Sequence, residues 1–159
     1  MSGNNEYKIE LDEIDRQLIK ILSIDSRTPY RTIANELNIS VGTIHNRIEK
    51  LIENNIIKSF TAQLDHKRCG FNITAVIGVK LNDSQSIEWL NDKNLTKNIV
   101  VAYDVTGEYD AIIIAKFRDT DELSVFIKEL GNKPQVDRTY TQTVLNVFKE
   151  DFESLANEF

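Results

Sequence analysis

Apolar residues recur at helical spacing after residue 11 and predict three short helices in succession. The first helix has apolar residues at positions i, i+4, i+7 and i+8, namely Ile14, Leu18, Ile21 and Leu22. Asp12 is placed to cap the N-terminus of this helix, and Asp15 adds negative charge to the first turn, where the helix dipole favours it. We expect the helix to end near Asp25-Ser26.

A tight turn separates the second predicted helix from the third. Thr28-Pro29 predicts the start of the second helix, because a capping residue precedes a proline at the first helical position. The inner face of that helix is Ile33, Ala34 and Leu37. After a turn at Asn38-Ile39, Ser40 caps the third helix, whose buried stripe is predicted to be Ile44, Ile48, Leu51 and Ile52. We expect Asn54-Asn55 to end it, because asparagine tolerates the left-handed conformation.

The residues after the third helix alternate between apolar and polar positions, which predicts a strand over residues 59–64. Three short helices with a tight turn, followed by a strand, are typical of a helix-turn-helix domain with a small wing. We therefore expect a flexible N-terminal tail over residues 1–10 and a winged helix-turn-helix DNA-binding domain over residues 11–64.

The rest of the chain predicts a second domain over residues 72–159, after a polar linker at residues 65–71. Strands are expected at residues 73–81, 99–105, 111–117 and 136–148, and helices at residues 84–95 and 120–130. The order β-α-β-β-α-β indicates an α+β fold, a ferredoxin-like sandwich with both helices on one face of an antiparallel sheet. Residues 111–115 are apolar on both sides, which favours oligomerisation through the other face.

The distribution of charge refines this interpretation. The chain carries a formal net charge of −6, yet residues 26–68 hold seven basic and four acidic groups. A DNA-binding segment is therefore compatible with an acidic total. The sequence has neither a signal-peptide pattern nor an apolar run long enough for a membrane helix, and its single cysteine, Cys69, excludes an internal disulfide. We expect a cytoplasmic protein that makes no membrane contact.

Polar residues on the outer face of the third helix are the candidates for DNA contacts. Thr43, His45 and Asn46 could meet base edges, while Tyr30 and Arg31 are placed for backbone phosphates. The complete candidate set for DNA binding is Arg27, Thr28, Tyr30, Arg31, Ser40, Thr43, His45, Asn46, Arg47, Lys50 and Lys58. The basic members are the expected phosphate anchors. A three-helix bundle with a solvated polar face explains the same pattern equally well.

The turn between the two central strands is the candidate small-molecule site. Gly107 suits a turn that visits positive φ, and the neighbouring backbone N–H groups could bind an anion. Asp104 and Asp110 could accept hydrogen bonds from an ammonium group, so that the turn would cradle a free amino acid. A plain hairpin turn with solvated carboxylates is the alternative interpretation.

Together these parts resemble the Lrp/AsnC family of prokaryotic transcription regulators, also called leucine-responsive or feast/famine regulatory proteins. The resemblance rests on LDEIDRQLIKIL, RTIANELNISVGTIHNRIEKLIENNIIKSF, VTGEYDAIIIAKF and VDRTYTQTVLNVFK. It implies a first domain that binds double-stranded DNA and a second that forms homodimers, tetramers or octamers and binds an amino-acid effector. The effector residues that it implies are Asp104, Val105, Thr106, Gly107, Glu108, Tyr109, Asp110, Thr139 and Thr141.

Other classes of function have weaker support in the sequence. His45 and His66 lie 21 residues apart without an acidic or cysteine partner at ligand spacing, so we expect neither a metal site nor a cofactor. No nucleophile–base pair and no glycine-rich phosphate loop stands out, so we expect no catalytic residues and no enzyme activity. A regulator that binds DNA without an effector, acting through oligomerisation or a protein partner, stays open.

Overall fold

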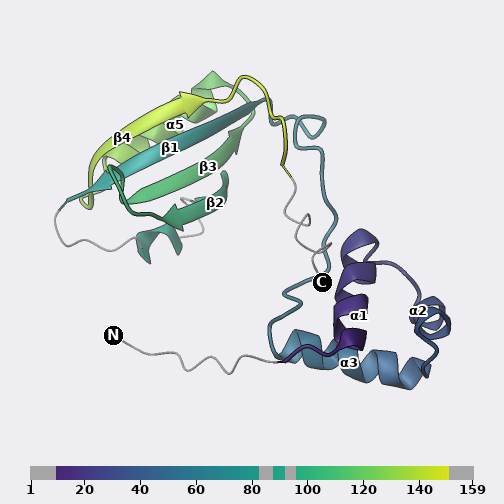
Figure 1. Cartoon of the computed structure of the whole chain (residues 1–159). Helices are drawn as coiled ribbons and strands as arrows, with labels where there is room; N and C mark the ends of the chain where they lie inside the picture. Colours follow the sequence, from purple (N-terminus) through teal and green to yellow (C-terminus); the bar gives the residue numbers. More distant parts are fainter. Residues whose placement is uncertain (1–9, 83–87, 92–95, 151–159) are drawn as a thin grey trace. The chain divides into compact units, whose positions relative to one another are not determined.

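The computed structural model describes residues 10–82, 88–91 and 96–150. The chain divides into two compact units, one containing residues 10–62 and the other Gln63–Phe148 (Figure 1). Within the described residues, no helix combines the length and the apolar character needed to cross a membrane.

Three helices form the first unit: α1 (Glu13–Ile24), α2 (Tyr30–Leu37) and α3 (Val41–Glu53). A capping box begins α1, because the Asp12 side chain accepts the Asp15 N–H and the Asp15 side chain accepts the Asp12 N–H. The helices enclose a core of Leu18, Ile19, Leu22, Ile33, Ala34, Ile44, Ile48 and Leu51. The three predicted helices are therefore confirmed.

Two details of these helices differ from the predictions. Pro29 occupies the N-cap position of α2, and the Thr28 hydroxyl donates instead to the Asp25 carbonyl at 2.8 Å, so the predicted Thr28 cap is wrong. Ile52 is 42% exposed and does not belong to the buried stripe of α3. The reason is rotation: at about 100° per residue, Ile52 lies about 80° from Ile44 around the helix axis. Asn55 adopts the left-handed conformation after α3, with φ 56°, as expected.

The predicted wing strand at residues 59–64 is wrong. In the structure these residues have no regular secondary structure. Phe60 and Leu64, two of the apolar residues of that alternation, are exposed. A strand needs hydrogen bonds from a neighbouring strand, and alternation alone does not supply that neighbour.

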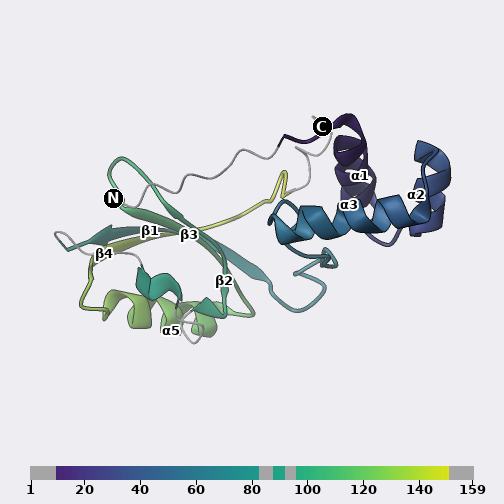
Figure 2. The same ribbon diagram turned by 90° about the horizontal axis from the view of Figure 1, so that it is seen from below.

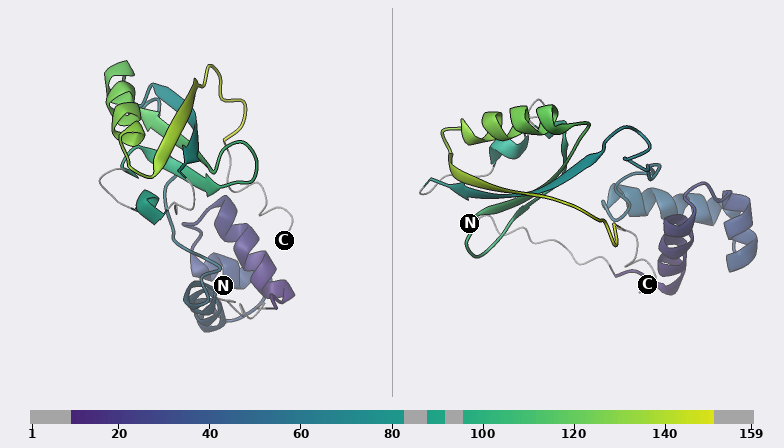
Figure 3. Two further views of the ribbon diagram at one scale, coloured as in Figure 1. Left: turned by 90° about the vertical axis from the view of Figure 1, so that its left-hand side faces the viewer. Right: turned by 90° about the horizontal axis from the view of Figure 1, so that it is seen from above.

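Four strands form the sheet of the second unit: β1 (Ile73–Leu81), β2 (Ile99–Asp104), β3 (Ala111–Phe117) and β4 (Val136–Thr143). The spatial order is β2-β3-β1-β4, and every neighbouring pair is antiparallel. The helix α5 (Thr120–Gly131) and the short 3-10 helix η1 (Glu88–Asn91) lie on one face of this sheet (Figures 2 and 3). The α+β, ferredoxin-like arrangement is confirmed.

Strand alternation gives the sheet one buried and one open face. Ala111, Ile113 and Ala115 are fully buried toward the helices, while Ile112 and Ile114 on the other face are only half-buried. The core under the helices consists of Ala75, Ile77, Val79, Ala111, Ile113, Ala115, Phe117, Phe126, Leu130 and Val136. One apolar side of the sheet therefore lacks a cover among the described residues.

Two predicted elements of this unit are corrected. The last strand ends at Thr143 rather than residue 148, because its partner β1 pairs Ala75 with Thr143 close to its own start. Beyond that point the chain leaves the sheet, and Phe148 is 97% exposed. Of the helix predicted at residues 84–95, the structure describes only η1, a 3-10 helix, and the remaining positions lie outside the described residues.

The burial of Leu18 generates a stability prediction. Replacing this fully buried residue by alanine (Leu18→Ala) should lower the free energy of unfolding of the first unit by about 2–5 kcal/mol, because it removes apolar contacts and leaves a cavity. Ile24→Ala, on the same helix but exposed, is the control and should change it by less than about 0.5 kcal/mol. Urea unfolding followed by circular dichroism at 222 nm measures both, and equal effects would contradict the core assignment.

Candidate nucleic-acid interface and effector turn

The N-terminus of α3 is organised by its own side chains. The Ser40 Oγ atom accepts the Thr43 N–H at 3.0 Å, and the hydroxyl groups of Ser40 and Thr43 are 2.8 Å apart. This bonding satisfies one of the otherwise unpaired N–H groups at the helix start. Ser40 and Thr43 therefore hold the first turn of α3 in shape while they lie at its exposed end.

His45 and Tyr30 come together from two different helices. The His45 ring meets the Tyr30 ring edge-on, with 6.1 Å between the centroids. The Nδ1 atom of His45 lies 3.3 Å from the Glu49 carboxylate, one turn further along α3. Asn46 and Lys50 are exposed on the same helix. The outer face of α3 thus presents hydrogen-bonding side chains, with the start of α2 beside it.

The other candidates for phosphate contacts surround this face. Arg31 is exposed in the first turn of α2, and Lys58 is exposed after α3. Arg27 is exposed in the turn before α2, with its Nε atom 3.5 Å from the Asp25 carboxylate. The Thr28 hydroxyl is occupied by its bond to the Asp25 carbonyl. Arg27, Arg31 and Lys58 therefore keep their charges accessible to solvent.

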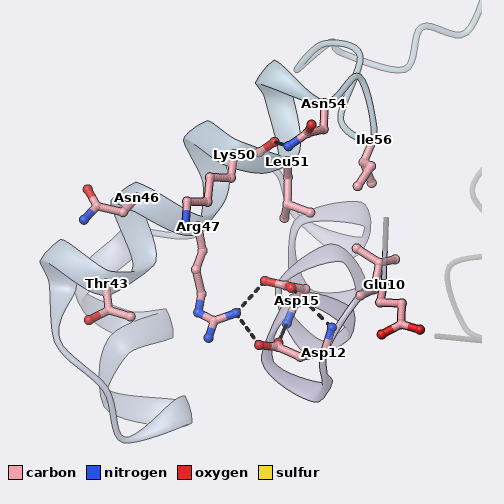
Figure 4. Close-up of a pocket in the computed structure, with 11 residues that line it drawn as sticks. Glu10, Asp12, Asp15, Thr43, Asn46, Arg47, Lys50, Leu51, Asn54 and Ile56 are labelled. Atoms are coloured by element: carbon pink, nitrogen blue, oxygen red, sulfur yellow. Dashed lines mark hydrogen bonds and ion pairs between the residues drawn. The ribbon is translucent and has the colours of Figure 1, made fainter. Parts of the chain in front are cut away.

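Arg47, one of the expected phosphate anchors, is paired with two carboxylates of its own unit. Its Nη1 group donates to the carboxylates of Asp12 and Asp15 at 2.7 Å each, and only 26% of its side chain is exposed (Figure 4). The pKa of Asp12 lies below its ordinary value, because the carboxylate accepts the Asp15 N–H and a charged bond from Arg47. The same two carboxylates raise the pKa of Arg47. We name Arg47, Asp12 and Asp15 the α1–α3 clamp.

The clamp borders an open groove of about 530 Å³ between α3 and the start of α1 (Figure 4). Its lining residues are Glu10, Leu11, Asp12, Asp15, Thr43, Asn46, Arg47, Lys50, Leu51, Asn54 and Ile56. Figure 4 shows the Arg47 side chain running from α3 toward the two carboxylates, while Asn46 points away from them. Sequence reasoning missed this ion pair, although the acidic first turn of α1 was visible.

In the second unit, the turn at residues 104–110 joins β2 to β3 and is tied to β1. The Asp110 N–H donates to the Val79 carbonyl at 2.9 Å, and the Val105 N–H donates to the Asp110 carbonyl at 3.1 Å. Gly107 has a φ of 125°, as the sequence predicted. We name residues 104–110, the candidate effector site, the effector turn.

The carboxylate of Asp110 is engaged by its own chain. One oxygen accepts the Leu81 N–H at 2.8 Å, and the other lies 3.1 Å from Lys80 Nζ. Its pKa is lowered first by the Leu81 N–H and then by Lys80. Both oxygens of this carboxylate, which we expected to accept from an ammonium group, thus already accept hydrogen bonds from the chain itself.

Tyr109 fixes the effector turn to the open face of the sheet. Its ring lies against Gly78, where an added Cβ would sit 2.8 Å from ring atoms. The ring also stacks on Tyr140, with centroids 6.2 Å apart and planes 20° apart. Sequence reasoning missed Tyr140, although a glycine inside a strand indicates close approach by another group.

The remaining effector candidates do not all gather around the turn. Thr139 and Thr141 pair with Val79 and Ile77, which are buried on the helix-bearing face. Directly paired residues point to the same side of a sheet, so these two threonines lie on the opposite face from Tyr109. Glu108 is exposed and lies 3.9 Å from Arg138. Asp104, at the end of β2, and Thr106 are exposed, while Val105 is half-buried.

Among the residues that the structure describes, no group of three or more histidine, cysteine, aspartate or glutamate side chains could hold a metal ion.

Comparison with family models matches the chain twice. Residues 11–52 match the AsnC-type helix-turn-helix domain, and residues 74–154 match the Lrp/AsnC ligand binding domain. An uncharacterised HTH-type transcriptional regulator of Pyrococcus horikoshii is 44% identical over 146 residues, covering 91% of this chain and 97% of its own. The HTH-type transcriptional regulator Ptr1 of Methanocaldococcus jannaschii is 40% identical, covering 88% and 95%.

A solved structure has the same fold. The feast or famine regulatory protein of M. tuberculosis, complexed with L-methionine, superposes with a TM-score of 0.81 at 22% identity. The match covers 90% of this chain and 97% of that one.

The Tyr109–Gly78 contact generates a prediction. Gly78→Ala should displace the ring and lower the free energy of unfolding of the second unit by about 1–3 kcal/mol, the usual cost of overpacking. Trp89, the single tryptophan, reports this unit by fluorescence in urea. Gly131→Ala is the matched control, because its Cβ would meet nothing within 4 Å. A loss for Gly78→Ala no greater than for the control would contradict the contact.

The lowered carboxylate pKa values generate a second prediction. The pKa values of Asp110 and Glu122 lie below their ordinary range, chiefly because each carboxylate accepts a backbone N–H. Such groups bind fewer protons in the folded state, so their stabilisation is full above about pH 4 and is lost as pH falls through the folded pKa. The urea concentration at the midpoint of unfolding, followed by Trp89 fluorescence, should therefore decrease as the pH is lowered below about 4. In Asp110→Asn that drop should be shallower, and an unchanged drop would contradict the role of Asp110.

Proposed function

The chain belongs to the Lrp/AsnC family of DNA-binding transcription regulators, and from this premise we propose that α3 enters the major groove of double-stranded DNA. The observation that carries this proposal is the outer face of α3, where Asn46 and Lys50 are exposed on the side opposite the fully buried Ile44 and Ile48. Side chains of this kind can donate to and accept from base edges and phosphates.

Contacts with the DNA backbone come, in this proposal, from the periphery of the same face. Arg27 and Arg31, before and within the first turn of α2, contact phosphates on one side, and Lys58 does so on the other. All three are exposed, which supports the assignment. Tyr30 and His45, whose rings pack edge-on, are in this proposal the aromatic pair that contacts the DNA groove.

The second unit, we infer, joins two copies of the chain through the open face of its sheet. Ile112 and Ile114 are half-buried on that face and Tyr140 is 55% exposed, so covering them removes apolar surface from water. A homodimer of this kind would present two α3 helices to successive major grooves about 34 Å apart on a pseudo-palindromic site. Further assembly into tetramers or octamers would build on the dimer.

The effector in this proposal is a free amino acid held by the effector turn. Gly107 has a positive φ. In this proposal, the backbone N–H groups of residues 106–108 donate to the carboxylate of the amino acid. The M. tuberculosis relative of the same fold is complexed with L-methionine, which supports an amino acid as the class of ligand. Asp110 and Tyr109 shape the turn, and Asp104 is the candidate for the ammonium group.

The alternative is a regulator that binds DNA without an effector and acts through oligomerisation or a protein partner. The self-contained bonding of Asp110 favours it, because that carboxylate already has its partners within the chain.

DNA fragments selected from genomic DNA by the purified protein test the role of α3. Asn46→Ala should relax base preference at one position of the selected motif. Lys50→Ala should weaken binding to all sequences and reduce the slope of log K against log salt by about 0.9, since each phosphate contact releases counterions. Lys128→Ala, an exposed lysine on α5, is the control and should change neither quantity. Unchanged binding in both α3 variants would contradict the proposal.

Sedimentation velocity with and without L-methionine and other single amino acids tests the effector. The ligand should shift the distribution of assemblies, because it stabilises the assembly that binds it more tightly. Gly107→Val should abolish the shift, since a β-branched residue is strained at a φ of 125°. Gly131→Ala should retain it. A normal response in Gly107→Val would place the ligand elsewhere, and no response to any amino acid in the unmodified protein would favour the alternative.

A further inference from the structure

The clamp between α3 and α1 joins the proposed DNA-reading helix to the N-terminal turn of α1. Arg47 lies 35 residues from Asp12 and 32 residues from Asp15, yet one Nη1 group donates to both carboxylates at 2.7 Å. These distances are those of strong, charge-assisted hydrogen bonds. Arg27, an exposed arginine of the same unit, makes only a 3.5 Å side-chain contact with a neighbour in sequence, Asp25.

The two carboxylates also hold the start of α1. Asp12 accepts the Asp15 N–H at 2.9 Å, and Asp15 accepts the Asp12 N–H at 3.3 Å. Arg47 therefore binds a rigid acceptor pair whose orientation the capping box already sets. The apolar core beneath, including Leu18 and Ile48, holds the helices together without directional bonds. The hydrogen bonds of the clamp, in contrast, are directional and favour one orientation of α3 relative to α1.

The clamp lies beside the side chains of α3 that we propose contact DNA. Its three side chains line the same open groove as Thr43, Asn46 and Lys50 (Figure 4). Without the guanidinium, two unpaired carboxylates would face that groove together with Glu10, and they would repel approaching phosphates.

We infer that Arg47 is a positioning residue for DNA binding, which orients α3 and neutralises Asp12 and Asp15 in place of contacting a phosphate itself. This inference rests on the proposed function, namely that α3 enters the groove of DNA. It replaces our expectation that Arg47 is a phosphate anchor.

A double-mutant cycle in the full-length protein separates the two roles. Arg47→Ala is compared in the native background and in Asp12→Asn/Asp15→Asn, which removes both negative charges and leaves an amide oxygen at each position that can accept the same backbone N–H. Affinity is measured for the DNA fragment selected by the unmodified protein. Arg47→Ala should weaken binding by about tenfold or more in the native background and by no more than about threefold in the double variant.

The salt dependence supplies a readout that distinguishes positioning from contact. The slope of log K against log salt should stay unchanged in Arg47→Ala, whereas Lys50→Ala on the same helix should reduce it by about 0.9. A slope reduced by about 0.9 in Arg47→Ala, with equal losses of affinity in both backgrounds, would mean that Arg47 contacts a phosphate and would overturn the inference.

Thermal unfolding of the same variants, followed by circular dichroism, measures the clamp without DNA. Arg47→Ala should lower Tm in the native background and change it less in the double variant. Arg47→Lys, which keeps the charge but cannot reproduce the guanidinium geometry, is measured alongside in case Arg47→Ala fails to fold. It should also lower Tm more in the native background than in the double variant, by a smaller amount than Arg47→Ala does.

The outcomes separate this inference from the proposed function. If Asn46→Ala and Lys50→Ala leave DNA binding unchanged, the proposed role of α3 fails, whatever the Tm cycle shows. If those variants weaken binding, but Arg47→Ala weakens binding by the same factor in both backgrounds, the positioning inference alone fails.

Discussion

The burial of one face of α3 against α1 and α2 is the interaction on which the first unit depends. Ile44 and Ile48 are fully buried, and Leu51 continues the same stripe. Once that stripe is against the core, the rotation of α3 is set, and every other side chain on the helix has a determined direction. Asn46 and Lys50 face outward for that reason, and Arg47 lies at the margin where it reaches the start of α1.

The second unit uses the same one-sided burial in a sheet. Its helices cover the face that carries Ile77 and Ile113, and the opposite face is left with half-buried isoleucines and the stacked pair Tyr109–Tyr140. The effector turn is tied to this open face through Gly78. A partner seated on the open face would therefore contact the aromatic pair that holds the turn, and in the proposed function this contact would couple assembly to effector binding.

Aspartates organise both candidate sites in the same way. Asp12 and Asp110 each accept a backbone N–H and a bond from a cationic side chain, and both have lowered pKa values. In each case the carboxylate joins segments distant in sequence: α1 to α3, and the effector turn to β1. Charged residues at both candidate sites thus serve the geometry of the chain.

The sequence by itself determined the helices α1, α2, α3 and α5, three of the four strands almost to the residue, and the left-handed end of α3 at Asn55, because periodicity, capping and asparagine's tolerance of positive φ are local properties. It also indicated the family. Tertiary structure decided the rest. Residues 59–64 alternate like a strand but have no regular secondary structure, because alternation does not supply a neighbouring strand to pair with. β4 ends at Thr143, which pairs with Ala75 near the start of β1. Arg47 pairs with Asp12 and Asp15, and Asp110 with Lys80, because the fold brings distant charges within hydrogen-bonding distance, which no spacing along the chain records.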